Sequence, residues 1–218
     1  MRKAIRKGDP SRTPIRIKRW ITHHRRDIPV CPVCNHEVTV AGGKPQGPVA
    51  HFRHPPKTGC PIVESGRKPY EVFKPTRGTS AAEIKRVKQY ALDHIESIYE
   101  RASVLCPNLT WKEFLPLLKK ATELRCWSYK KFNTGYIPYL LLCCADKFKG
   151  TKGSKRPRTI FFVLESGAQD AEFWHLPPSP KKRIWRVVQS TKNLDDIQMV
   201  MDEIEPWYRK QARMNLKL

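Results

Sequence analysis

The sequence predicts an α+β fold with an N-terminal zinc-finger module, a helical middle, a small antiparallel sheet and a C-terminal helix. Three observations lead to this prediction. A cysteine/histidine pattern occupies residues 31–60, apolar residues recur every three or four positions over 84–102, and three strand-like apolar runs come later in the chain. We therefore expect two domains, a basic arm with a zinc-finger module over 1–78 and a basic α+β domain over 79–218.

The N-terminal domain is expected to contain little regular structure. Residues 15–21, IRIKRWI, alternate apolar and basic side chains, which predicts a strand with one charged face. Residues 41–78 are rich in Gly and Pro and show little periodicity. They are expected to form loops around the cysteine/histidine pattern.

Two helices are expected in the middle of the chain, each with a capping-box pattern at its start. Ser80 and Glu83 begin the first helix, and Thr110 and Glu113 begin the second. The apolar stripe of the first is Ile84, Val87, Ala91, Ile95, Ile98 and Ala102, and that of the second is Phe114, Leu117, Leu118 and Ala121. Pro116 is expected to kink or shorten the second helix.

The second half of the chain combines apolar runs with basic turns. Residues 139–145 are the longest uninterrupted apolar run and are expected in the core, although their secondary structure stays open. Strand-like runs occupy residues 159–165, 171–176 and 183–189. A last helix is expected from about Asn193, with the stripe Leu194, Ile197, Met201 and Ile204 and a break near Pro206.

The segment CPVC…HFRH…C offers five candidate metal ligands, which are Cys31, Cys34, His51, His54 and Cys60. Zn²⁺ takes four such ligands in a tetrahedron. A Cys₂His₂ site would use both histidines, whereas a Cys₃His site would use Cys60 and one of them. We favour the Cys₃His site, because a thiolate binds zinc well and a lone cysteine in a Gly/Pro-rich loop has little other use. The spacing alone leaves the choice of histidine open.

A structural Zn²⁺ is a better interpretation than a catalytic one. Residues 41–50 hold three glycines and two prolines and cannot build a core alone, so a metal ion is expected to hold them in place. A catalytic zinc needs an open coordination position and a general base. Glu37 and Glu64 are the nearest carboxylates, and neither HExxH nor HxE…PCxxC occurs. We therefore expect no enzymatic activity.

The charge of the chain predicts a polyanionic partner. Lys and Arg number 42 against 20 Asp and Glu, which gives a net charge of +22 and favours nucleic acid. The candidate contacts form three clusters: Arg16, Lys18, Arg19, Arg25 and Arg26; Lys149, Lys152, Lys155, Arg156 and Arg158; and Lys181, Lys182 and Arg183. Trp20 and Trp185 lie beside two of these clusters but are expected in the core.

No apolar run approaches the roughly 18 residues of a spanning helix, and the N-terminus has no apolar signal segment. We therefore expect a cytoplasmic protein with reduced thiols and no membrane partner.

The motifs CPVC, HFRH and GCPIVES resemble the N-terminal zinc module of CoiA-like competence proteins over residues 28–66. This resemblance implies that a nuclease domain of the restriction-enzyme type follows, with an acid on one strand and an acid-x-Lys motif on the next. Here the acid-x-Lys match, Glu83-Ile84-Lys85, opens a predicted helix. Glu165 and Glu172 lie on strand-like runs without a Lys two residues later.

The overall layout, a short basic chain with an N-terminal zinc finger and an α+β remainder, resembles the large subunit of type IV CRISPR effector complexes, which act in antiviral defence. This resemblance implies a non-catalytic subunit that binds guide RNA and target DNA beside the protospacer, together with other protein subunits. We therefore expect a zinc-finger nucleic-acid-binding subunit of a ribonucleoprotein. The alternatives are a CoiA-like DNA-processing protein or nuclease, and a basic protein-interaction module such as a phage-encoded inhibitor.

Overall fold

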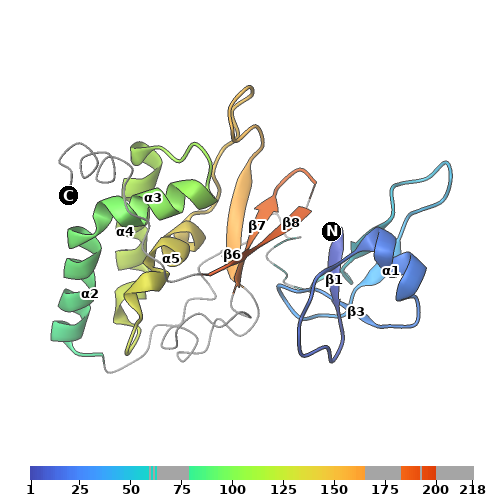
Figure 1. Cartoon of the computed structure of the whole chain (residues 1–218), viewed down its shortest axis with the longest axis horizontal. Helices are drawn as coiled ribbons and strands as arrows, with labels where there is room; N and C mark the ends of the chain where they lie inside the picture. Colours follow the sequence, from blue (N-terminus) through green and yellow to red (C-terminus); the bar gives the residue numbers. More distant parts are fainter. Residues whose placement is uncertain (59, 61, 63–78, 165–182, 192, 200–218) are drawn as a thin grey trace, which may run out of the picture.

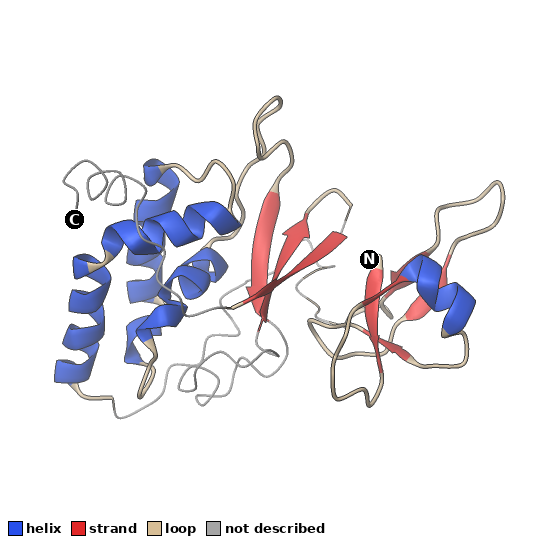
Figure 2. Cartoon of the chain, in the orientation of Figure 1, coloured by secondary structure: helices blue, strands red, loops and turns tan. Residues whose placement is uncertain are grey.

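The computed structural model describes residues 1–58, 60, 62, 79–164, 183–191 and 193–199. Within these residues the chain forms helices and small antiparallel sheets, which confirms the α+β class. A three-stranded sheet lies in the middle, with a group of helices on one side and the N-terminal module on the other (Figures 1 and 2). In the part of the chain that the structure describes, no helix has the length and apolar character to cross a membrane.

The N-terminal module consists of two small sheets and one short helix. Strand β1 (Lys3–Arg6) pairs antiparallel with β2 (Ile15–Arg16) and with β3 (Pro29–Val30). Helix α1 (Ile17–His23) follows β2, and β4 (Thr39–Ala41) pairs with β5 (His51–Arg53) as a hairpin.

The strand predicted over residues 15–21 is wrong beyond Arg16, since the chain turns into α1 at Ile17. A strand would place Arg16, Lys18 and Trp20 on the same face. In the helix, Ile17 and Trp20 lie one turn apart and are both buried, while Lys18 and Arg19 are exposed. The burial of the indole therefore favours the helix.

The first predicted helix exists but is broken into α2 (Ala81–Asp93) and α3 (Ile95–Leu105). The Ser80 hydroxyl accepts a hydrogen bond from the backbone N–H of Glu83, as the capping pattern predicts. The break falls at His94, whose ring stacks on Tyr90 at 4.0 Å and donates a hydrogen bond to the Tyr90 carbonyl. The stripe residues Val87, Ala91, Ile98 and Ala102 are nevertheless all buried.

Helix α4 (Trp111–Glu123) begins with a complete capping box between Thr110 and Glu113. Pro116 lies inside this helix, which continues to Glu123, so the expected shortening does not occur. Burial of Phe114, Leu117 and Ala121 offsets the hydrogen bond that the proline removes.

The apolar run whose type was open is helix α5 (Ile137–Cys144), and all eight of its residues are buried. The short helices η2 (Cys126–Ser128) and η3 (Thr134–Tyr136) connect α4 to α5. Cys143 and Cys144 lie in the core, as expected from their apolar neighbours.

The central sheet has the order β6 (Ile160–Leu164), β7 (Arg183–Val188) and β8 (Asn193–Gln198), with antiparallel pairs throughout. Strands β6 and β7 confirm two of the three strand-like runs, while the run 171–176 lies outside the described residues.

The helix predicted to begin near Asn193 is wrong at its start, because these residues form β8. Leu194 and Ile197 are three positions apart and so lie on opposite faces of the strand. Leu194 belongs to the core on the module side, and Ile197 packs against the core on the helix side. A strand that buries apolar residues on both faces can therefore show the three-residue spacing that is typical of one face of a helix. The rest of the predicted stripe lies outside the described residues.

Both faces of the sheet are covered by apolar cores. On the helix side, Ile160, Phe162, Leu164 and Ile184 join residues from α2, α3, α4 and α5. On the module side, Phe161, Val163, Trp185, Val187 and Leu194 join residues of the N-terminal module such as Trp20, Val38 and Phe52. The helices and the N-terminal module therefore pack on opposite faces of the same sheet.

This arrangement predicts that the module and the helical part unfold together. Phe161 and Phe162 are neighbours on β6, both buried, and face opposite cores. Replacing either residue by Ala should lower the free energy of unfolding by about 3–5 kcal/mol. In calorimetry we expect one transition that both variants shift to lower temperature. Two transitions, each sensitive to only one of the variants, would contradict a shared fold.

Candidate metal centre and basic surfaces

Three segments bring candidate metal ligands together. Cys31 follows β3 directly, and the chain then turns so that the backbone N–H of Asn35 donates to the Cys31 carbonyl at 2.9 Å. Asn35 has a left-handed backbone with φ of 61°, which asparagine tolerates well. The turn returns the Cys34 thiol toward Cys31. The second segment is the end of β5, which is followed directly by His54. The third segment carries Cys60, six residues later.

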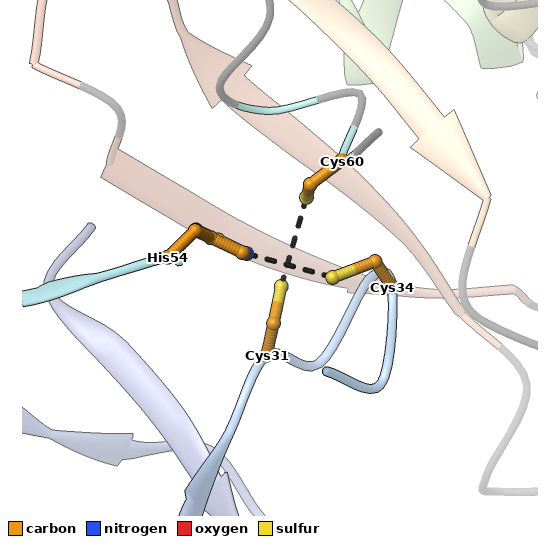
Figure 3. A group of neighbouring side chains, drawn as sticks. All are labelled: Cys31, Cys34, His54 and Cys60. Atoms are coloured by element: carbon orange, nitrogen blue, oxygen red, sulfur yellow. Dashed lines mark hydrogen bonds between the residues drawn. The ribbon is translucent and has the colours of Figure 1, made fainter. Parts of the chain in front are cut away.

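The ligand atoms of Cys31, Cys34, His54 and Cys60 all lie within 4.8 Å of one another and point to a common centre (Figure 3). The Cys31 and Cys60 sulfurs are 4.0 Å apart, and the Cys34 sulfur is 3.5 Å from His54 Nε2. Sulfur ligands at about 2.3 Å from a tetrahedral ion would be about 3.8 Å apart. The four residues could therefore hold one metal ion, and their Cys₃His chemistry is compatible with zinc.

His54, and not His51, completes this cluster. The His51 ring lies on β5 and its Nδ1 donates to the Val49 carbonyl at 3.0 Å, outside the cluster. His54 is only 9% exposed, and its Nε2 points toward the three sulfurs. The structure therefore selects one of the two histidines that the spacing left open, within the Cys₃His set that we favoured.

The thiols of the cluster differ in their proton affinity. Burial raises the pKa of the Cys31 thiol well above its ordinary value. Hydrogen bonds from the Cys31 and Cys60 thiols lower the pKa of Cys34 well below its ordinary value. A metal ion that takes all four ligands must therefore displace a proton from Cys31. Binding at this centre weakens as the pH falls, because protons compete with the metal for sulfur.

The cluster lies where the module meets the sheet. Cys31 and Cys60 are fully buried and belong to the same apolar core as Trp185 and Val187 of β7. In Figure 3 strands of the central sheet lie behind the four side chains. Ile62, two residues after Cys60, is buried in this core as well. A metal ion at the centre would join the turn after β3 to the segment that carries Cys60.

The two histidines provide a matched pair of variants. Replacing His54 by Ala should remove one of four ligands, lower the bound zinc and destabilise the N-terminal module, whereas His51→Ala should leave the zinc content unchanged. Zinc per chain is measured by atomic emission after purification, and stability by thermal unfolding with and without chelator. Equal zinc content in the two variants, or loss of zinc only in His51→Ala, would contradict the assigned ligand set.

The first basic cluster surrounds α1. Arg16, Lys18, Arg19, Arg25 and Arg26 are all exposed. Arg16 lies on β2 just before the helix, Lys18 and Arg19 lie on α1, and Arg25 and Arg26 follow it. The Arg25 Nε also donates to the Ile21 carbonyl, which holds its stem against the end of the helix. The cluster thus consists of α1 and the residues on either side of it.

The second cluster, residues 149–158, forms a hairpin that leads into the first residue of β6 (Figure 1). It is closed by the pairing of Phe148 with Ile160 and by a hydrogen bond from the Thr151 N–H to the Arg156 carbonyl. Gly150 is needed here, because a Cβ at this position would lie 2.4 Å from the Arg158 carbonyl carbon. Its exposed cations are Lys149, Lys152, Lys155 and Arg158.

Arg156 differs from the other predicted contacts of the hairpin, because it is only 7% exposed. Its guanidinium forms an ion pair with Glu113 at 2.6 Å and donates to the Cys106 sulfur and the Lys149 carbonyl. Burial raises the pKa of Cys106 to about 11, so its thiol is neutral and Glu113 supplies the countercharge. Arg156 is therefore an anchor of the hairpin, a role that the sequence pattern did not reveal.

The third cluster is described only in part. Lys181 and Lys182 lie outside the described residues. Arg183 is half-buried and places its guanidinium 5.8 Å from the centre of the Trp185 ring. The ring itself is buried, as is that of Trp20, which confirms that both tryptophans are core residues. Arg183 opens β7 at the end of the sheet opposite the hairpin, so these two clusters do not merge.

The carboxylates considered for catalysis show no assembled site among the described residues. Glu37 is exposed and forms an ion pair with Lys7 at 2.6 Å. Glu83 and Lys85 lie in the first turns of α2, so the acid-x-Lys match is helical. Glu64, Glu165 and Glu172 lie outside the described residues.

Comparison of the chain with protein-family models, with curated proteins and with solved structures found no match. The resemblances to CoiA-like competence proteins and to type IV CRISPR large subunits thus gain no support from these comparisons.

Proposed function

We propose that the chain is a zinc-stabilised, non-catalytic nucleic-acid-binding protein. The observation that carries this proposal is a set of exposed cations on two structured elements, helix α1 with its flanking residues and the hairpin 149–158. Phosphate backbones are bound by clusters of exposed Lys and Arg side chains. We call these surfaces the α1 face (Arg16, Lys18, Arg19, Arg25 and Arg26) and the basic hairpin (Lys149, Lys152, Lys155 and Arg158).

The α1 face lies in a module with little acidic compensation. Residues 1–58 contain 13 Lys and Arg against three Asp and Glu. Each of these acids already has a partner within the module. Asp9 pairs with Arg6, Asp27 with His24 and Glu37 with Lys7. The positive potential of the α1 face is therefore left for a ligand to neutralise.

The basic hairpin is organised before any ligand binds. The ion pair of Arg156 with Glu113 holds its base against α4, and Gly150 approaches the Arg158 backbone closely across the hairpin. A structured loop loses less conformational entropy on binding than a flexible one. Four mutually repelling cations on one short turn add nothing to folding, which favours a role in binding a polyanion.

Zinc is assigned a structural role in this proposal. The four protein ligands would fill a tetrahedral coordination sphere, whereas catalytic zinc sites retain a position for water or substrate. The ligands are also largely buried against the central sheet. The metal would thus stabilise the module that presents the α1 face.

The salt dependence of binding tests the basic hairpin. Changing Lys152 or Lys155 to Gln should weaken binding to both DNA and RNA and reduce the slope of log affinity against log salt by about one unit per lost phosphate contact. Lys85 and Lys88, exposed on α2, provide matched controls that should leave the slope unaltered. Fluorescence anisotropy with labelled oligonucleotides measures both quantities.

An unaltered slope in the hairpin variants would exclude the hairpin as a phosphate contact. Binding that is independent of salt, or equal effects of the hairpin and α2 variants, would argue against a defined nucleic-acid surface. Divalent-metal-dependent cleavage of the oligonucleotide would contradict the non-catalytic proposal and favour the CoiA-like nuclease alternative.

A more specific form of this function is a large subunit of a type IV CRISPR effector, and it stays a prediction. Purification of the tagged chain from its native cell should then recover small RNAs of defined length with a shared repeat-derived end, together with several other protein subunits. Heterogeneous DNA, or the protein alone, would contradict this form. A single protein partner that survives nuclease treatment would favour an inhibitor-like module.

A further inference from the structure

An apolar groove with an acidic rim lies between α3 and the first turn of α4, on the helical side of the molecule. Its volume is about 660 Å³, and Glu96, Tyr99, Glu100, Val104, Leu109 and Trp111 are among the residues that line it. Neither the metal centre nor the basic surfaces contribute to it. Its signal in the sequence is weak, although Glu96, Glu100 and Val104 follow at intervals of four along α3.

The groove has a fixed aromatic wall. The Tyr99 hydroxyl donates to the Leu109 carbonyl at 2.7 Å, and its ring contacts Trp111 edge to face at 5.2 Å. Trp111 also stacks on the buried Phe114 at 5.5 Å. Despite these contacts Trp111 remains 44% exposed and Val104 63% exposed. The wall is thus rigid and apolar, and it faces solvent.

The rim of the groove is acidic within a chain of net charge +22. Glu96 and Glu100 lie one helical turn apart, and both line the groove. In the described part of the chain no Lys, Arg or His forms an ion pair with Glu100. The Glu100 carboxylate beside the exposed indole of Trp111 forms a site for a cation with an apolar stem.

We propose that this groove binds a basic, amphipathic segment of a partner protein. In this arrangement a Lys or Arg side chain lies along Trp111 with its charge at Glu100, and a neighbouring apolar side chain covers Val104. The carboxylates repel phosphate, so a nucleic acid does not fit here. The groove therefore provides a protein contact separate from the α1 face and the basic hairpin, and it does not depend on nucleic-acid binding.

A designed peptide tests the chemistry directly. The probe is a labelled 14-residue helix with Leu and Arg at helical spacing, and the comparison peptide carries Glu in place of Arg. The net charge of the protein repels the basic probe elsewhere on the surface. We expect the basic peptide to bind at physiological salt and, in NMR titrations, to shift signals of α3 and the start of α4.

Glu100→Gln should weaken peptide binding by about two- to fivefold, because it removes the ion pair. Val104→Ser should also weaken binding, because it removes an apolar contact. Glu100→Lys should abolish it. Leu92→Ser is the matched control, because Leu92 is 65% exposed on α2 and outside the groove, and it should have no effect. Oligonucleotide affinity should stay unchanged in Glu100→Gln, which separates this test from that of the proposed function.

Three outcomes would overturn the proposal. The basic peptide does not bind, or it binds with signals that shift outside the groove. Glu100→Lys and Leu92→Ser have equal effects. Alternatively, Val104→Ser changes the oligomeric state in sedimentation, which would identify a second copy of the chain as the occupant.

Discussion

Burial of both faces of the central sheet is the constraint on which the rest of the structure depends. A strand that is apolar on each side must be covered twice. In this chain the helices cover one face and the N-terminal module covers the other. The module is small and rich in loops. Its apolar core is completed by side chains from the central sheet. Its charged surface and its metal ligands are therefore held by the same sheet that supports the helices.

The metal ligands fit this arrangement because they lie at the point where the module touches the sheet. Cys31 and Cys60 are buried beside Trp185, while the cations of the α1 face point to solvent. The chain thus separates its two kinds of chemistry. The cysteine and histidine side chains that could bind a metal ion are largely buried, whereas the cations of the α1 face are exposed and stay hydrated. This separation is compatible with the proposal that a metal ion would stabilise the module while its outer surface binds a polyanion.

The sequence predicts most of what depends on local patterns. The two capped helix starts, the core strands β6 and β7 and the Cys₃His set all follow from spacing and residue type. It fails where tertiary contacts decide. The α1 segment is helical because Trp20 must reach the core, and β8 resembles a helix because both of its faces are buried. The choice of His54 and the burial of Arg156 depend on partners distant in sequence, which no spacing rule identifies.

The two oxygens of Glu113 have separate partners. Oε2 accepts from the backbone and hydroxyl of Thr110 and fixes the first turn of α4, whereas Oε1 holds Arg156 at the base of the basic hairpin. Trp111, the first residue of this helix, forms a wall of the acidic groove. A single carboxylate consequently connects the base of the basic hairpin to the first turn of α4, the same turn that carries the Trp111 wall of the acidic groove.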